Sequence, residues 1–429
     1  MIYLFLLYDI LFFWGLLLVL PWYFFRKKLT LRGLLHKLSF FTCKDYLKVI
    51  FKKSIWIQVV SVGEVLLIKN FVNQLISSFA YPLVISVTTR SGKEVADKIY
   101  SSCASVIYFP YDISLVIRRM IKAINPCLFI TVETEMWPNL FYQLKRKHIP
   151  IIVLNGRISS ISFKKYKKII FLMKRVLNWV SFLGVQNEIY RQRFLYLGAD
   201  KERIAVTGNM KFTSLACDEK YFARFKNKYG NLKQKGEILF VVGSTHHPEE
   251  EMILKVYTRV RKDYPNLILL LAPRHIERIP KIERTIKSLG LSSLRISQID
   301  KLERKTHQVY LLDSVGELFY FYGIADICFV GGSLANYGGH NILEPLYFSK
   351  PTIFGRYMSN FPDVKEKVLK TNSAVMVKDE RELETSIIKI IKDEEFRRRL
   401  SANSLEVFKE EKENLKKNIN IITRILGDG

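Results

Sequence analysis

The sequence has few cysteines, and none of them stand in paired spacing. Of its 429 residues only five are cysteine, at Cys43, Cys103, Cys127, Cys217 and Cys328. An odd number of widely scattered cysteines excludes a disulfide framework and a zinc site. Several lie inside apolar runs, so we expect buried thiols in a reducing compartment. Metal binding by histidine is also unsupported, because His246 and His247 are the only close pair.

Acidic residues are also in deficit. The chain has 67 Lys and Arg against 40 Asp and Glu, which gives a formal charge of +27. Such an excess attracts nucleic acid, anionic lipid or phosphorylated sugar, although a lysine-rich solvated surface explains it equally well. No Asp-x-Asp sequence occurs, although enzymes that hold a nucleotide diphosphate through a divalent metal often need one. A donor with one bridging phosphate could be neutralised by Lys211 and Arg274 alone.

One long apolar run is present, at the N-terminus. Residues 2–25 carry a single charge, Asp9, and are followed by Arg26, Lys27 and Lys28. No positive residue precedes the run and no small-residue cleavage site follows it, which argues against a signal peptide. We therefore expect residues 1–28 to form a hydrophobic membrane anchor that spans the bilayer or lies in one leaflet. Its basic flank places the following chain on the cytoplasmic side.

The rest of the chain alternates short apolar runs with helical patterns, which predicts parallel sheets and an α/β fold. A first series of strands is expected at 56–60, 83–87, 106–108, 128–131, 151–154, 182–185 and 204–206. A second is expected at 238–242, 267–271, 309–312, 327–330, 352–354 and 374–377. Two series imply two doubly wound, Rossmann-like domains, residues 29–217 and 218–395, facing a cleft. Residues 218–236 are interpreted as a linker or a solvated helix, and residues 396–429 as amphipathic helices.

A glycine-rich segment, residues 329–345, follows the strand at 327–330. Its two glycine pairs allow a tight turn that brings backbone N–H groups close to a ligand, and a helix start follows. Asn341 and Glu344 share a face of that helix, where a carboxylate suits sugar hydroxyls better than phosphate. The segment predicts a nucleotide pocket for phosphate and ribose.

Polar side chains gather at other predicted strand ends. Glu64 follows a buried strand and can either cap a helix or act as general base. Glu133 and Glu135 follow another strand, and Arg157 either contacts an anionic substrate or pairs with Glu133. Lys211 ends the first series, where it could meet a phosphate or simply be a solvated hinge residue.

The second series has similar strand ends. Ser244, Thr245 and His246 form a strand-to-helix loop whose N–H groups can bind an anion. Arg274 suits bidentate phosphate contact. Residues 315–317 open another helix beside them.

The segment 163–177 interleaves six basic side chains with apolar ones. On a helix this pattern suits a membrane surface, or a core helix with a lysine-rich solvent face. The N-terminal anchor favours membrane contact.

Taken in order, these motifs closely resemble the bacterial 3-deoxy-D-manno-octulosonic acid (Kdo) transferases of lipopolysaccharide synthesis, glycosyltransferase family 30. The resemblance runs from the anchor to about residue 380. It rests on the segments 61–64, 133–139, 155–157, 186–187, 207–212, 273–275 and 331–345.

The resemblance implies a GT-B fold on the cytoplasmic face of the bacterial inner membrane. It implies an inverting enzyme, without metal or cofactor, that moves Kdo from CMP-Kdo to the lipid A precursor lipid IVA. Glu64 matches the proton acceptor, and Glu133 and Lys211 match transition-state stabilisers. The matched CMP-binding positions are Pro273, Arg274, Val315, Gly316, Glu317, Asn341, Ile342, Leu343 and Glu344. Further substrate contacts are expected from Ser244, Thr245, His246 and Arg157.

Two other readings remain open. One is a different membrane-associated GT-B transferase that uses a UDP-sugar and a cell-envelope lipid. The other, prompted by the charge, is a membrane-tethered nucleic-acid binder, although the basic residues are dispersed and no nucleic-acid motif is present, so we expect no nucleic-acid partner.

Overall fold

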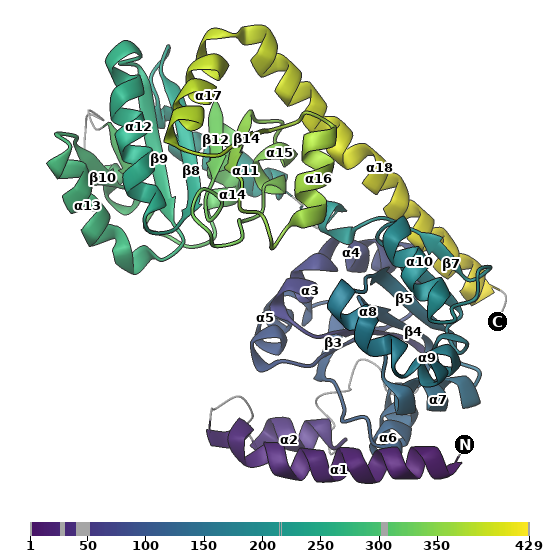
Figure 1. Ribbon diagram of the computed structural model, residues 1–429. Coiled ribbons are helices and arrows are strands. Elements are labelled where there is room, and N and C mark those ends of the chain that lie inside the picture. Colours follow the sequence, from purple (N-terminus) through teal and green to yellow (C-terminus); the bar gives the residue numbers. More distant parts are fainter. Residues whose placement is uncertain are drawn as a thin grey trace. The chain divides into compact units, whose positions relative to one another are not determined.

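The computed structural model describes residues 2–25, 31–39, 52–213, 215, 217–301 and 308–427. The chain divides into two compact units, Met1–Ser214 with Glu411–Gly429, and Leu215–Glu410 (Figure 1). Each unit is described by itself, so the predicted cleft between the domains stays a prediction.

The first unit is built on seven parallel strands in the order β3-β2-β1-β4-β5-β6-β7. The strands are β1 (Ser54–Val59), β2 (Leu83–Val87), β3 (Ala104–Tyr108), β4 (Pro126–Val132), β5 (Ile151–Gly156), β6 (Phe182–Val185) and β7 (Ile204–Val206). β1 and β4 pair in the centre, with Ile57 opposite Ile130. The central strands are apolar on both faces because helices cover both.

Two apolar cores lie on the two faces of this sheet, one around Trp56 and Phe129 and one around Ile57 and Phe71. The helices before β4 are α1 (Ile2–Phe25), α2 (Leu31–Lys37), α3 (Val62–Leu67), α4 (Lys69–Ser78), α5 (Arg90–Tyr100) and α6 (Ser114–Ile124). Those after it are α7 (Pro138–Arg146), α8 (Ser160–Lys167), α9 (Ile170–Leu177), α10 (Glu188–Tyr196) and the 3-10 turn η2 (Met210–Thr213).

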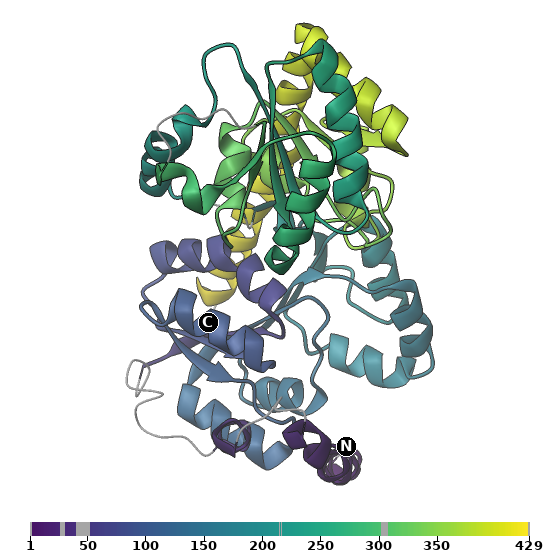
Figure 2. The same cartoon turned by 90° about the vertical axis from the view of Figure 1, so that its left-hand side faces the viewer.

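The second unit has its own seven parallel strands, in the order β10-β11-β9-β8-β12-β13-β14, with helices on both faces (Figure 2). The strands are β8 (Ile238–Thr245), β9 (Leu267–Pro273), β10 (Ser293–Arg295), β11 (Val309–Leu311), β12 (Ile327–Val330), β13 (Thr352–Gly355) and β14 (Val375–Val377). The helices are α11 (Glu219–Tyr229), α12 (Glu249–Asp263), α13 (Ile279–Ser288), α14 (Leu318–Ile324), α15 (Leu343–Tyr347), α16 (Pro362–Lys370) and α17 (Glu380–Lys392).

Both sheets reverse their strand order at one place, between β1 and β4 and between β8 and β12. The loops leaving two such strands diverge, which opens a crevice at their carboxyl ends where ligands of α/β proteins bind. Glu64 and Glu133 follow β1 and β4, while His246 and the glycine-rich segment follow β8 and β12. The topology therefore places both predicted groups of residues at binding positions.

Two local expectations hold in part and one, the burial of the cysteines, is wrong for Cys103. Of the two interpretations of residues 218–236 the helix is confirmed, because residues 219–229 form α11, although this helix buries Phe222, Phe225 and Tyr229 and is not wholly solvated. The C-terminal segment is one helix, α18 (Glu394–Gly427), and its last part belongs to the first unit, where Leu415 and Ile422 join the core. Cys103 is exposed although Cys328 is buried, and Cys43 lies outside the described residues.

The N-terminal helix α1 has a docked face and an exposed face. Asp9, the single charge in the apolar run, accepts hydrogen bonds from the Ser114 N–H at the start of α6 (3.0 Å) and from the Asn139 side chain (2.7 Å). The Tyr8 hydroxyl donates to buried Asp112. Within the described part of the chain, no helix has the length and hydropathy needed to cross a membrane. A membrane-spanning anchor is therefore not supported, and Asp9 instead fixes α1 to the domain.

Candidate active site

Glu64 lies in the first turn of α3, directly after β1. Ser61 caps this helix, and the Glu64 carboxylate accepts from the Ser61 hydroxyl (3.1 Å) and from the Val60 N–H (2.8 Å). Burial raises the pKa of Glu64 to about 7, and the negative charge of Glu133 adds to the rise. A carboxyl group with this pKa can accept a proton near neutral pH. The capping and general-base interpretations are thus compatible.

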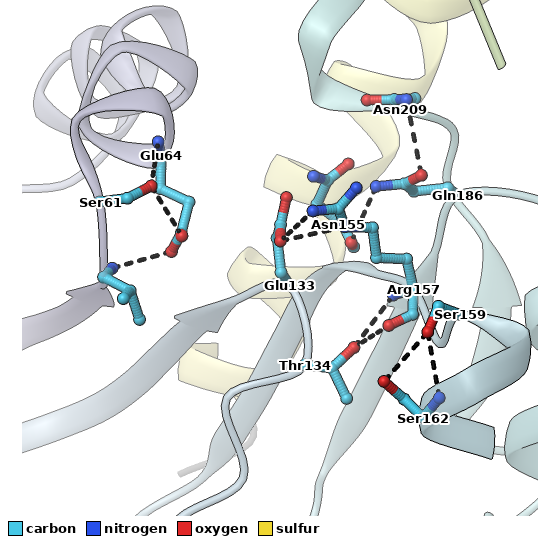
Figure 3. Close-up of polar contacts among 11 residues, drawn as sticks. Ser61, Glu64, Glu133, Thr134, Asn155, Arg157, Ser159, Ser162, Gln186 and Asn209 are labelled. Atoms are coloured by element: carbon cyan, nitrogen blue, oxygen red, sulfur yellow. Dashed lines mark hydrogen bonds and ion pairs between the residues drawn. The ribbon is translucent and has the colours of Figure 1, made fainter. Parts of the chain in front are cut away.

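Glu133 lies across the switch point from Glu64, after β4 (Figure 3). Its backbone has a positive φ of 63°, a strained conformation for a residue that is not glycine. Arg157, at the end of β5, holds the Glu133 carboxylate from Nε and Nη2, each at 3.0 Å. The alternative that Arg157 pairs with Glu133 is therefore confirmed. A strained backbone whose side chain is held by a two-pronged ion pair is typical of a functional position.

Lys211 is positioned by a buried amide network at the ends of β5, β6 and β7. Asn155 accepts from the Met210 N–H (3.0 Å), and Asn209 accepts from the Lys211 N–H (3.0 Å). Gln186 donates to the Asn155 carbonyl (3.2 Å), which links the strand ends (Figure 3). The turn η2 that carries Lys211 contacts α3, the helix of Glu64. The structure therefore brings Glu64, Glu133 and Lys211 to one edge of one sheet.

In the second unit, backbone N–H groups of the glycine-rich segment already bind a carboxylate of the protein itself. The Glu249 carboxylate accepts from five backbone N–H groups, those of His246, Gly332, Ser333, Leu334 and Ala335, at 2.7–3.1 Å. Gly332 has a positive φ of 66°, and a Cβ there would meet the His340 ring at 2.8 Å. The predicted phosphate cradle is wrong for these N–H groups, because Glu249 occupies them.

The predicted ribose-binding pair, in contrast, is brought together, although Asn341 lies before α15 and not on it. The Asn341 amide donates to the Glu344 carboxylate at 3.4 Å. Burial raises the pKa of Glu344 to about 7, while Asn341 and the nearby Arg274 oppose the rise. Arg274 is exposed at the end of β9 and lies close enough to influence Glu344. The guanidinium of Arg274 suits a phosphate, and the buried carboxyl group of Glu344 suits sugar hydroxyls.

The other predicted residues of this unit divide into exposed and enclosed ones. Val315 is 85% exposed and Gly316 has a positive φ of 99°, so the loop before α14 is open to a ligand. Glu317 accepts from the Ser314 hydroxyl. Ile342 and Leu343 are buried, as is Pro273, and they contribute backbone and packing.

Ser244 and Thr245 have structural roles in the loop between β8 and α12. Ser244 has a positive φ of 57°, and its carbonyl lies against Gly331. The Thr245 hydroxyl is buried and donates to Glu250 (3.2 Å), so its side chain does not face a ligand. We correct the expected Thr245 contact to a structural role.

His246 belongs to an aromatic stack that the sequence did not predict. Its Nε2 lies 2.9 Å from Nε2 of His340, and the rings are parallel within 5°. Tyr337 stacks on a face of the His246 ring, with ring centroids 4.2 Å apart. Burial lowers the pKa of His340 to about 4 and also lowers the pKa of His246, which favours two neutral rings that share one hydrogen bond. In the sequence, Tyr337 and His340 flank a glycine pair, and this pattern is the feature from which the aromatic group could have been predicted.

Within the described residues, no group of three or more His, Cys, Asp or Glu side chains is arranged to hold a metal ion.

Comparison with known proteins decides the family. Residues 33–214 match the family described as 3-deoxy-D-manno-octulosonic-acid transferase (kdotransferase). A 3-deoxy-D-manno-octulosonic acid transferase of Haemophilus influenzae is 34% identical over 372 residues, which are 86% of this chain and 86% of that one. This chain belongs to the Kdo transferase family. It is therefore a glycosyltransferase of lipopolysaccharide synthesis with a GT-B type pair of α/β domains.

Other similar proteins put this Kdo transferase in context. A bifunctional glycosyltransferase/methyltransferase of Fusobacterium nucleatum is 40% identical over 337 residues, which are 78% of this chain but 52% of that protein. The chain thus spans about half of that relative. The UDP-GlcNAc 2-epimerase of Neisseria meningitidis, solved with UDP-GlcNAc bound, has a TM-score of 0.59 at 13% identity and covers 88% of this chain and 100% of its own. At this identity the likeness shows the fold alone.

Proposed function

We propose that this Kdo transferase moves Kdo from CMP-Kdo to a sugar hydroxyl of lipid IVA, with inversion and without a metal ion. The observation that carries the proposal is Glu64, a half-buried carboxylate at the first switch point with a pKa of about 7. A sugar hydroxyl is a weak nucleophile until a base removes its proton, and Glu64 is placed and tuned for that step.

The reaction is a single displacement. Glu64 takes the proton of the acceptor hydroxyl while its oxygen forms a bond to the anomeric carbon of Kdo. The bond from that carbon to the CMP phosphate oxygen breaks, and CMP leaves with the electron pair. Because attack and departure occur on opposite faces of one carbon, the configuration inverts.

Glu133 and Lys211 are proposed to stabilise the transition state. Positive charge develops on the sugar ring as the phosphate departs, and a carboxylate such as Glu133 favours it. Arg157 orients Glu133 through its two-pronged contact. Lys211 offers a cation to the carboxylate of Kdo or to the departing phosphate.

The second unit is proposed to hold CMP. Arg274 would contact its phosphate, which gains negative charge as the bond breaks, and the guanidinium supplies a fixed cation. Glu344 and Asn341 would accept and donate to the ribose hydroxyls. The open loop of Val315, Gly316 and Glu317 lies in the same unit and would contact the nucleotide from its exposed side.

Contact with the cytoplasmic face of the inner membrane is part of the proposal, because the acceptor is a lipid. One face of α1 exposes Leu7, Leu11, Trp14 and Leu18 at helical spacing, with Leu18 81% exposed. The α8–α9 segment exposes Ile161, Ile169, Ile170 and Phe171 next to Lys164, Lys165 and Lys168. Apolar side chains flanked by lysines suit an anionic lipid surface.

Product analysis tests the function. Purified protein is incubated with lipid IVA and either CMP-Kdo or UDP-sugars, and the lipid products are weighed by mass spectrometry. We expect a mass increase of one or more Kdo residues with CMP-Kdo alone. Transfer from a UDP-sugar instead would favour the alternative GT-B function. Arg274→Ala is expected to weaken CMP-Kdo binding, and an unchanged affinity would contradict its phosphate role.

A further inference from the structure

An apolar pocket lies between α1 and the body of the first unit. α1 contributes Phe12, Gly15, Leu16 and Val19 to its wall. The opposite wall comes from the loops after β2, β3 and β4, through Thr88, Phe109, Pro110, Tyr111 and Trp137. Figure 1 shows α1 along this side of the unit, beside α2 and α6. The contacts of Asp9 with α6 and α7 hold the helix in place as one side of the pocket.

The size and lining of the pocket suit a hydrocarbon chain. Its volume is about 450 Å³. An apolar cavity of about 150 Å³ holds one benzene, so this pocket has room for roughly three times as many carbon atoms. Its lining is mostly apolar, and the carboxylate of Asp112 is already taken by the N–H groups of Asn139 and Leu140 and by the Tyr8 hydroxyl. A buried chain would therefore meet few unsatisfied polar groups.

Hydrogen bonds connect the pocket wall to the loop that positions Glu64. The hydroxyl of Thr88, which lines the pocket, accepts from the Gln58 amide (3.0 Å). The next residue, Thr89, donates to the Val60 carbonyl (2.9 Å), and the Val60 N–H is the one that binds Glu64. A molecule with its sugar at Glu64 can therefore extend into the pocket along the same edge of the sheet.

Positive charge lies at the pocket wall. The Lys37 ammonium donates to the Thr88 carbonyl (2.9 Å) and lies 5.6–5.8 Å from the ring centroids of Tyr108 and Tyr111. A lipid with an anionic head and an apolar tail matches a cation beside an apolar hollow. A neutral apolar peptide would not use the cation.

We propose that this pocket takes one acyl chain of the lipid acceptor and so sets its sugar hydroxyl at Glu64. The inference rests on the proposed function and adds a specificity site to it. The enzyme would thereby distinguish an acylated acceptor from the same sugar without chains, beyond the concentrating effect of a membrane surface.

Gly15→Phe tests the proposal by filling the pocket from the helix. A Cβ added at Gly15 meets no atom within 4 Å, so the new side chain begins in open space. Transfer is measured in detergent micelles with lipid IVA and with its chemically de-acylated form. We expect the ratio of kcat/KM for the acylated over the de-acylated acceptor to fall at least about tenfold, the loss that corresponds to two excluded methylene groups.

Leu18→Phe is the matched control, because it makes a similar change on the exposed face of α1. It should leave the ratio unchanged, whereas Gly15→Leu should give an intermediate loss. A retained ratio in both Gly15 variants, with an active wild-type enzyme, would overturn the pocket proposal alone. A wild-type enzyme that transfers Kdo to neither acceptor would overturn the proposed function and this inference together.

Discussion

At the scale of single residues, the candidate site depends on carboxylates whose surroundings differ. Glu64 is half-buried and its pKa is raised, whereas Glu133 is held by a guanidinium. Two nearby carboxylates with different partners can divide the roles of proton acceptor and charge stabiliser. The pH dependence of transfer should reflect this, since kcat/KM falls below about pH 7, where Glu64 becomes protonated.

Replacing Arg157 by Met should shift the acidic limb of the pH–rate profile, which is the pH range in which kcat/KM falls as Glu64 becomes protonated. Without the guanidinium, the charge of Glu133 is less offset, and its repulsion raises the pKa of Glu64 further. We expect a lower kcat and an acidic limb displaced to higher pH in a pH–rate profile. Arg191→Met is the matched control, because its ion pair with Glu188 lies on the surface of α10. An acidic limb at the wild-type position in Arg157→Met would show that the pair does not tune Glu64.

The sequence predicted Glu64, Glu133 and Arg274 because each follows an apolar run at a predicted strand end, and it predicted Glu344 from the glycine-rich segment; their roles stay predictions. It could not show what occupies a group of N–H donors. Glu249 fills the glycine-rich segment because the chain after β8 folds back on that after β12, and this is a tertiary contact between residues over eighty positions apart.

At the scale of secondary-structure elements, short helices and loops are fixed by carboxylates bound to N–H groups. Asp9 binds the start of α6, Asp112 binds the start of α7, and Glu249 binds the turn after β12. Each contact satisfies donors that a loop or helix start leaves free. Strands were predictable from continuous apolar runs, whereas β10 was missed because Ser293–Arg295 has one buried residue and no such run.

Glu249→Gln should destabilise the second unit. The amide places its own N–H₂ group against backbone N–H donors and leaves some of them unsatisfied in the interior. We expect the free energy of unfolding to fall by about 2–3 kcal/mol, measured by urea unfolding. Glu251→Gln, on the exposed side of the same helix turn, should change it little. Equal stabilities of the two variants would show that the five N–H contacts make no net contribution to the free energy of unfolding.

At the scale of the whole molecule, the charge of +27 and the exposed apolar face of α1 both favour an anionic lipid surface. The apolar run of residues 2–25 predicted a hydrophobic N-terminal element. Composition alone could not show that one face of this helix docks on the protein, because Tyr8 and Asp9 find their partners more than one hundred residues away.

Vesicle flotation tests this surface. The protein should float with phosphatidylglycerol vesicles at low salt and less at high salt, because salt screens the lysines. The double variant Trp14→Asp and Leu18→Asp should lose binding, whereas Leu405→Asp, an exposed leucine on α18, should not. Undiminished flotation of the double variant would place membrane contact elsewhere.

The central claim is that Glu64 is the base that activates the acceptor hydroxyl. The most direct measurement is the turnover of Glu64→Gln with CMP-Kdo and lipid IVA, beside its affinity for CMP-Kdo. We predict that kcat falls about 10²–10⁴-fold while donor affinity is retained, and that Glu202→Gln, a control at an exposed position, behaves as wild type. Near-normal turnover in Glu64→Gln would contradict the account.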